Sequence, residues 1–145
     1  EHGALQGDDT DSHIDTLARF CDPTTIAYVQ CTDTADEHYD ELRAMEDELR
    51  KFRTADGKPY RLIPLPMADA VVDSDGQRLP ATYANFLIIN GAVIVPSYGS
   101  PKDAIAEAKL QSIFPDRTIE TVDCLPLICQ HGSLHCITMQ FPACC

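Results

Sequence analysis

The sequence predicts an α/β or α+β protein in which helices cover one side of mixed sheets. Short β-branched runs alternate with two segments of helical spacing, and the order strand, strand, helix, strand occurs twice. A stretch rich in Pro, Asp, Ser and Gly separates the two occurrences. We therefore expect a first unit over residues 1–80 and a second over residues 81–145, which together form part of one domain.

The first unit has one helix signal between strand signals, and the ambiguously alternating segment His13–Phe20 is its expected first strand. Thr25–Cys31 and Tyr60–Leu65 are apolar or β-branched runs, and the prolines of the second run confine it to a sheet edge or a strand end. Asp33–Phe52 has helical spacing, with Asp33 or Thr34 as the expected N-cap. The expected apolar face of this helix consists of Leu42, Met45, Leu49 and Phe52.

The second unit repeats this order and contains a strong hairpin signal. Tyr83–Ile89 and Ala92–Val95 are predicted strands, and the Asn90-Gly91 pair between them is typical of a tight turn. Lys102–Phe114 is the second predicted helix. Its expected apolar face includes Ile105, Ala108 and Leu110. Two further strands are expected at Thr118–Val122 and Leu134–Phe141.

Composition limits the classes of function. The 145 residues are 44% hydrophobic, which excludes disorder of the whole chain. The chain has 23 acidic and 11 basic residues, so its net charge is −12. It contains no block of Lys and Arg that would bind nucleic acid or an anionic membrane. A small cationic molecule fits this charge better. We expect no cofactor.

Cysteine usage and hydropathy indicate a cytoplasmic protein. The seven cysteines are an odd number without framework spacing, so at least one thiol is expected to be free, as in a reducing compartment. No apolar run approaches the roughly 18–20 residues of a membrane span, and we see no basic and apolar leader.

Two clusters of polar residues could carry chemistry. Gly7–Asp15 holds four acids and a histidine, and in an extended segment His13 and Asp15 would point to the same face. A solvated acidic turn is the alternative interpretation, since His-x-Asp is a weak pattern. Cys129–Gln140 places a thiol at the expected start of a strand beside a Gly-Ser turn. Cys136 as a buried strand residue beside an exposed His135 is the simpler alternative.

A zinc site built from the second cluster is a further alternative. Its candidate ligands would be Cys129, His131, His135 and Cys136, but their spacing matches none of the usual zinc knuckles. Taken together, an upstream histidine and acid with a downstream cysteine suit covalent chemistry, in which the thiolate attacks and the imidazole moves protons.

Three motifs then carry a resemblance that extends over almost the whole chain. Gly7–Phe20, Tyr83–Gly91 and Gln130–Cys136 resemble the agmatine deiminase and Porphyromonas-type peptidylarginine deiminase family. The resemblance implies the pentein fold, a propeller of five ββαβ units, of which this chain would hold about two. The chain would then be the C-terminal portion of a longer enzyme, with little or no activity alone, and it would contact the N-terminal half or form a homo-oligomer.

The resemblance also implies a role for each residue. Cys136 would be the nucleophile, His13 the general acid/base, and Asp15 a carboxylate that binds the planar guanidinium cation in bidentate fashion. Asp9 and Gly132 are the other expected substrate-binding residues, and no metal is expected. Ser12 stands where the family has glycine, and the family's second guanidinium-binding acid has no matching motif here.

The implied reaction is the hydrolysis of a guanidine group without a cofactor. Agmatine would give N-carbamoylputrescine and ammonia for polyamine synthesis, and the alternative within the class is peptidyl-arginine giving citrulline. A non-catalytic module is the alternative from another class. Nucleic acid and membranes are not expected as partners.

Overall fold

The fold consists of two three-stranded sheets with the same topology. The structure is a computed structural model that describes residues 3–7 and 13–141. The first unit contains β1 (Ala18–Asp22), β2 (Thr25–Gln30), α1 (Tyr39–Leu49) and β3 (Arg61–Pro66). β2 is central and pairs antiparallel with β1 and parallel with β3. β3 therefore lies at a sheet edge, as its prolines predicted.

The second unit repeats this arrangement. It contains β4 (Leu87–Ile89), β5 (Ala92–Ser97), α2 (Lys102–Ile113) and β6 (Thr118–Asp123). β5 is central, antiparallel to β4 and parallel to β6. The predicted hairpin turns at Asn90-Gly91, where Gly91 has φ 79°, a left-handed conformation that favours glycine. The predicted order of two strands, a helix and a strand is thus confirmed in both halves, and the expected division at residues 80 and 81 stays a prediction.

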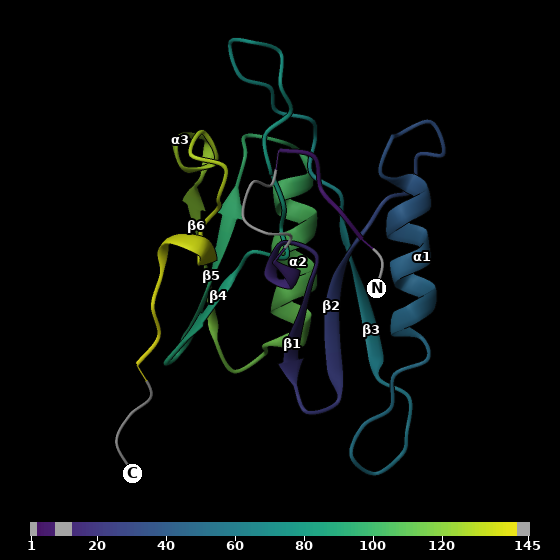
Figure 1. Cartoon of the computed structure of the whole chain (residues 1–145). Helices are drawn as coiled ribbons and strands as arrows, with labels where there is room; N and C mark the ends of the chain where they lie inside the picture. Colours follow the sequence, from purple (N-terminus) through teal and green to yellow (C-terminus); the bar gives the residue numbers. More distant parts are fainter. Residues whose placement is uncertain (1–2, 8–12, 142–145) are drawn as a thin grey trace.

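Both helices pack on the sheet of their own unit, and α2 also holds the two units together. Figure 1 shows the sheets next to each other, with α2 between them and α1 on the far side of the first sheet. α1 packs on β2, whereas α2 contacts β5 and β6 of its own unit and β3 of the other. Lys109 of α2 also donates a hydrogen bond to the carbonyl of Pro64 in β3. α2 therefore belongs to both units in packing terms.

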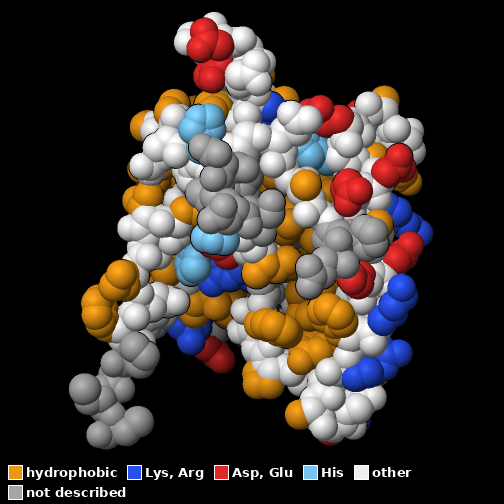
Figure 2. Space-filling model, in the orientation of Figure 1, with side chains coloured by type: hydrophobic (Ala, Val, Ile, Leu, Met, Phe, Trp, Pro, Cys, Tyr) orange, Lys and Arg blue, Asp and Glu red, His pale blue; other side chains and the backbone are white. Residues whose placement is uncertain are grey.

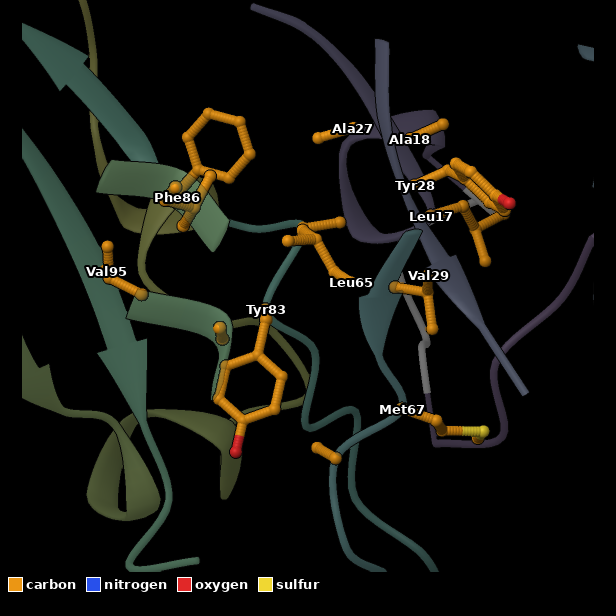
Figure 3. Packing of buried hydrophobic residues seen from close by; sticks show 14 of the residues in the cluster. Leu17, Ala18, Ala27, Tyr28, Val29, Leu65, Met67, Tyr83, Phe86 and Val95 are labelled. Atoms are coloured by element: carbon orange, nitrogen blue, oxygen red, sulfur yellow. The ribbon is translucent and has the colours of Figure 1, made fainter. Parts of the chain in front are cut away.

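A single apolar core fills the space between these elements. The buried side chains form one cluster that draws on both sheets. Figure 3 shows Leu65 of β3 between Val29 of the first unit and Phe86 and Tyr83 of the second. Since Leu65, Tyr83 and Phe86 are fully buried, the interface between the units is as dry as either interior.

The first helix begins later than the sequence predicted. Asp33 and Asp36 each form a local turn, in which Asp33 Oδ1 accepts from Ala35 N at 2.9 Å and Asp36 Oδ1 accepts from His38 N at 2.9 Å. These turns use the acids' oxygens before the helix starts at Tyr39, so neither Asp33 nor Thr34 is its cap.

The predicted helix faces are partly wrong. Leu42, Met45 and Leu49 are buried as expected, but Phe52 lies beyond the end of α1 and is exposed. On α2 the buried residues are Ala106 and Leu110, one turn apart, while Ile105 and Ala108 are exposed. The sequence pattern was therefore read in the wrong phase around this helix.

An apolar groove lies on the face that carries β1 and α1. Ile14, Phe20 and Phe52 are exposed and line a groove of about 380 Å³. Figure 2 shows this apolar patch between β1 and α1. The expected contact with the N-terminal half or with a second copy stays a prediction. Within the described ranges, no helix is long and apolar enough to cross a bilayer.

Truncation of Leu110 tests the packing of α2 between the sheets. Leu110→Ala is expected to lower the free energy of unfolding by about 2–5 kcal/mol, because it leaves a cavity in a fully buried position. Ile105→Ala on the exposed side of the same helix is the control, with an expected change within about 0.5 kcal/mol. Urea unfolding followed by circular dichroism measures both, and equal losses in the two variants would contradict this packing.

Candidate active site

The His-x-Asp motif lies on a short 3₁₀ turn before β1. This turn, η1 (Ile14–Thr16), closes because the carbonyl of His13 accepts from Thr16 Oγ1 at 2.9 Å and Leu17 N donates to Ile14 O at 3.0 Å. The expected extended segment is therefore wrong at this position. His13 stays exposed, whereas the Asp15 side chain is only 18% exposed.

The nucleophile candidate also lies on a 3₁₀ turn and not on a strand. Cys136 is the middle residue of η2 (His135–Ile137), and the predicted strand over Leu134–Phe141 does not form. The carbonyl of His135 accepts from Thr138 N at 3.0 Å and from Thr138 Oγ1 at 2.8 Å, which closes the turn. Cys136 remains exposed on it, so the alternative of a buried strand cysteine is excluded.

One buried amide joins these two turns. Asn85 is fully buried, and its Nδ2 donates to the backbone oxygen of Asp15 at 3.2 Å and to Asp15 Oδ2 at 3.1 Å. Its Oδ1 accepts from His135 N at 2.7 Å and from Cys136 N at 3.4 Å. Asp15 and Cys136, far apart in the chain, are therefore held on opposite ends of the same side chain.

This use of Asn85 explains two differences from the predicted strands. The N–H groups of His135 and Cys136 would serve a ladder in a strand, but here they donate to Asn85. The segment Tyr83–Phe86 likewise forms a buried turn, so that β4 begins only at Leu87. Sequence reasoning missed Asn85 as a site residue, although a polar residue inside an apolar run is a signal for a buried partner.

His135 is a second site residue that the sequence analysis did not assign. Its Nδ1 lies 2.6 Å from Asp15 Oδ2, and its side chain is 26% exposed. Because an ionised carboxylate only accepts hydrogen bonds, Nδ1 carries the proton and donates. Asp15 Oδ2 therefore receives donors from both His135 and Asn85.

Arg19 on β1 places a fixed cation beside these groups. Its Nη1 donates to the carbonyl of Phe86 at 2.9 Å, and its guanidinium lies 5.2 Å from the centre of the Phe86 ring. Burial lowers the pKa of Arg19, and attraction to Asp15 and Cys136 opposes this shift. The site thus contains one permanent guanidinium next to the acid that is expected to bind another.

The turn at Gly132 and Ser133 packs against Cys136. A Cβ on Gly132 would lie 3.1 Å from Cys136 Cβ, closer than ordinary contact, so the glycine allows the two backbones to approach. Ser133 is buried, and its Oγ shares a 2.7 Å hydrogen bond with Tyr98 OH, which also donates to Thr82 O at 3.0 Å. Gly132 therefore lies against the thiol-bearing residue.

Two further residues were expected at the site, His13 and Asp9. No described residue hydrogen-bonds to the imidazole of His13, and Asp9 lies outside the described residues. Figure 2 shows histidine side chains gathered over the region where the two 3₁₀ turns lie in Figure 1. Among the residues described, no three His, Cys, Asp or Glu side chains form a group able to hold a metal, so the zinc alternative finds no ligand set.

Burial distinguishes Cys136 from three of the other thiols. Burial raises the pKa of Cys21 to about 11, and it is also the main cause of the raised pKa of Cys31 and of Cys124. Only Cys129 and Cys136 are exposed among the described cysteines. Because the thiolate is the reactive form, the raised pKa makes these three thiols poor nucleophiles at neutral pH.

Two ββαβ units with a thiol and a carboxylate held between them define a portion of a pentein-type fold with a candidate cysteine site. The comparisons with known proteins agree. The chain belongs to the Porphyromonas-type peptidyl-arginine deiminase family, whose model matches residues 1–142. Agmatine deiminase of Pseudomonas fluorescens is 32% identical over 156 aligned residues, which cover 96% of this chain and 42% of that protein.

Solved structures support the same assignment. A Porphyromonas gingivalis protein with the provisional name arginine deiminase is 63% identical, with a TM-score of 0.96 over 98% of this chain and 42% of its own. A C. jejuni agmatine deiminase variant with substrate bound is 45% identical, with a TM-score of 0.85 over 93% of this chain and 38% of its own. The chain therefore spans about two-fifths of the length of these relatives.

Removal of the Asn85 amide tests its role as the link between the two turns. Asn85→Leu keeps similar volume but removes the side-chain acceptor of both N–H groups of η2 and leaves only the backbone oxygen of residue 85 for His135 N at 3.3 Å, so it is expected to cost about 1–3 kcal/mol. The amide hydrogens of His135 and Cys136 should also exchange faster with solvent. Gln140→Leu is the control, since Gln140 is an exposed amide that donates to the carbonyl of Ile88. Unchanged exchange at His135 and Cys136 in Asn85→Leu would contradict the proposed link.

Proposed function

We propose that this chain supplies the nucleophile, the acid/base and one guanidinium-binding carboxylate of a cysteine-dependent guanidine deiminase. The observation that carries the proposal is the Asn85 amide, which hydrogen-bonds to Asp15 at one end and to the backbone of Cys136 at the other. This contact supports a guanidinium pocket in which an acid and a thiol approach the same group.

The proposed chemistry has two steps at one carbon atom. The Cys136 thiolate attacks the central carbon of the guanidinium, and the C–N bond breaks as ammonia leaves with a proton from His13. His13 then takes a proton from water, which attacks the amidino-thioether carbon and releases the thiolate. The product carries a ureido oxygen in place of the lost nitrogen. His13 suits this role because it is exposed and lies two residues from Asp15.

Electrostatics favours a cationic substrate at this position. Asp15 presents one oxygen, Oδ1, that accepts no hydrogen bond from the described residues, while Oδ2 is occupied by His135 and Asn85. A guanidinium N–H can therefore donate to Oδ1 in a charge-assisted hydrogen bond. This supports single-oxygen binding, in contrast to the bidentate contact expected from the sequence.

Agmatine is the substrate that we propose, with N-carbamoylputrescine and ammonia as products and a place in putrescine synthesis. Support comes from two related proteins, one from P. fluorescens and one from C. jejuni, which are both named agmatine deiminase. The family description names peptidyl-arginine instead, and this keeps citrulline formation in peptides as the second candidate. Activity of the polypeptide that contains this chain on both compounds, measured as ureido product formed, decides between them.

Selective alkylation tests the nucleophile, because this measurement needs no turnover. Cys136 is expected to react with iodoacetamide faster than Cys129 by on the order of tenfold, although both thiols are exposed. Peptide mass spectrometry gives the rate at each cysteine of the 145-residue chain. Equal rates at Cys136 and Cys129 would remove the support for an enzyme site.

Replacement of Asp15 tests the guanidinium pocket. Two alkylating agents of nearly the same size, cationic chloroacetamidine and neutral chloroacetamide, differ mainly in charge and donor pattern. Asp15→Asn is expected to lower the ratio of their rates at Cys136 by about tenfold, because a hydrogen bond to a charged group is lost. Their rates with glutathione correct for intrinsic reactivity. A ratio that Asp15→Asn leaves unchanged would show that Asp15 does not bind the cation.

A further inference from the structure

The two carboxylate oxygens of Asp15 have different hydrogen-bond partners. One of the donors that distinguishes them is His135, the residue before Cys136. His135 Nδ1 lies 2.6 Å from Oδ2, and Asn85 Nδ2 lies 3.1 Å from the same atom. A carboxylate oxygen has two lone pairs, so these two donors saturate Oδ2. No described residue donates to Oδ1.

We propose that His135 is a positioning residue that fixes the Asp15 carboxylate and leaves only Oδ1 for the substrate cation. The inference rests on the proposed function, because it concerns how Asp15 would bind a guanidinium. His135 itself need not touch the substrate.

The placement of His135 on η2 gives this contact a mechanical consequence. His135 N and Cys136 N both donate to Asn85 Oδ1, and the His135 side chain returns to Asp15. The acid and the thiol are therefore connected by two routes, one through the Asn85 amide and one through the His135 imidazole. A rotation of the Asp15 carboxylate would have to break a hydrogen bond on each route.

Partial burial strengthens the hydrogen bond between His135 and Asp15. The side chains of Asp15 and His135 are only 18% and 26% exposed, so water competes less for the carboxylate than it does at an open surface. Without the His135 donor, Oδ2 would keep only the longer contact with Asn85, and the carboxylate could turn toward the guanidinium of Arg19 nearby. Cation binding at Oδ1 would then weaken while the thiol stayed in place.

Substitutions at His135 separate its donor from its volume. Asparagine places an N–H close to the position of Nδ1, glutamine places it one bond farther along the chain, and leucine supplies none. His135→Leu and His135→Gln are expected to lower the rate ratio of chloroacetamidine to chloroacetamide at Cys136 by about tenfold. His135→Asn is expected to stay within about twofold of the unchanged chain. The chloroacetamide rate alone should remain the same in all three variants.

A double-variant cycle tests whether His135 acts through Asp15. In chains that already carry Asp15→Asn, His135→Leu is expected to cause no further fall in the ratio. A further fall of similar size would assign His135 an effect of its own on the cation and overturn the proposal.

The outcomes are distinct. An unchanged ratio in His135→Leu, or equal losses in His135→Asn and His135→Gln, would overturn the role of the donor. A general loss of the chloroacetamide rate in every variant would make His135 a structural residue and also overturn it. Where His135→Leu does not fold, the pair His135→Asn and His135→Gln carries the test. If Asp15→Asn itself leaves the ratio unchanged, the proposed function fails and not the inference alone.

Discussion

The site depends on hydrogen bonds to one fully buried side-chain amide. Asn85 offers two donors and one acceptor oxygen in a fully buried position, and each is used: the donors by Asp15, the acceptor by the backbone of η2. An unpaired buried polar group is costly, so this environment has few alternative arrangements. The same bonds take up two N–H groups of η2 and hold Asp15 of η1 beside it, which places a carboxylate and a thiol on adjacent short turns.

Local patterns in the sequence were sufficient for the framework. Asn90-Gly91 defined the hairpin, and the prolines of β3 placed it at an edge, because turn geometry and missing N–H groups act within a few residues. The start of α1 could not be predicted in this way. Asp33 is a suitable cap by type, but its oxygen serves a nearer N–H, and only the actual backbone decides between the two.

The site was predictable only in part, because its key contacts join residues far apart in the chain. His13, Asp15 and Cys136 were selected as residue types that suit covalent chemistry, and the structure connects the last two through Asn85. Asn85 and Arg19 were missed, and His135 was considered only as a zinc ligand or an exposed neighbour of Cys136. Each lies within a run that reads as ordinary strand or turn, and its meaning comes from a partner that periodicity does not reveal.

Because α2 packs against both sheets, the position of one repeat relative to the other decides whether the site residues meet. The first repeat contributes the acid and the second contributes the amide and the sulfur, so neither repeat holds a complete set by itself. A fluctuation that separates the repeats at Leu65 would break the contact between Asp15 and Asn85 without breaking the hydrogen bonds within either sheet. The proposed site is then a property of the contact between the repeats, and mutations that loosen this contact would separate Asp15 from Asn85 without unfolding either repeat.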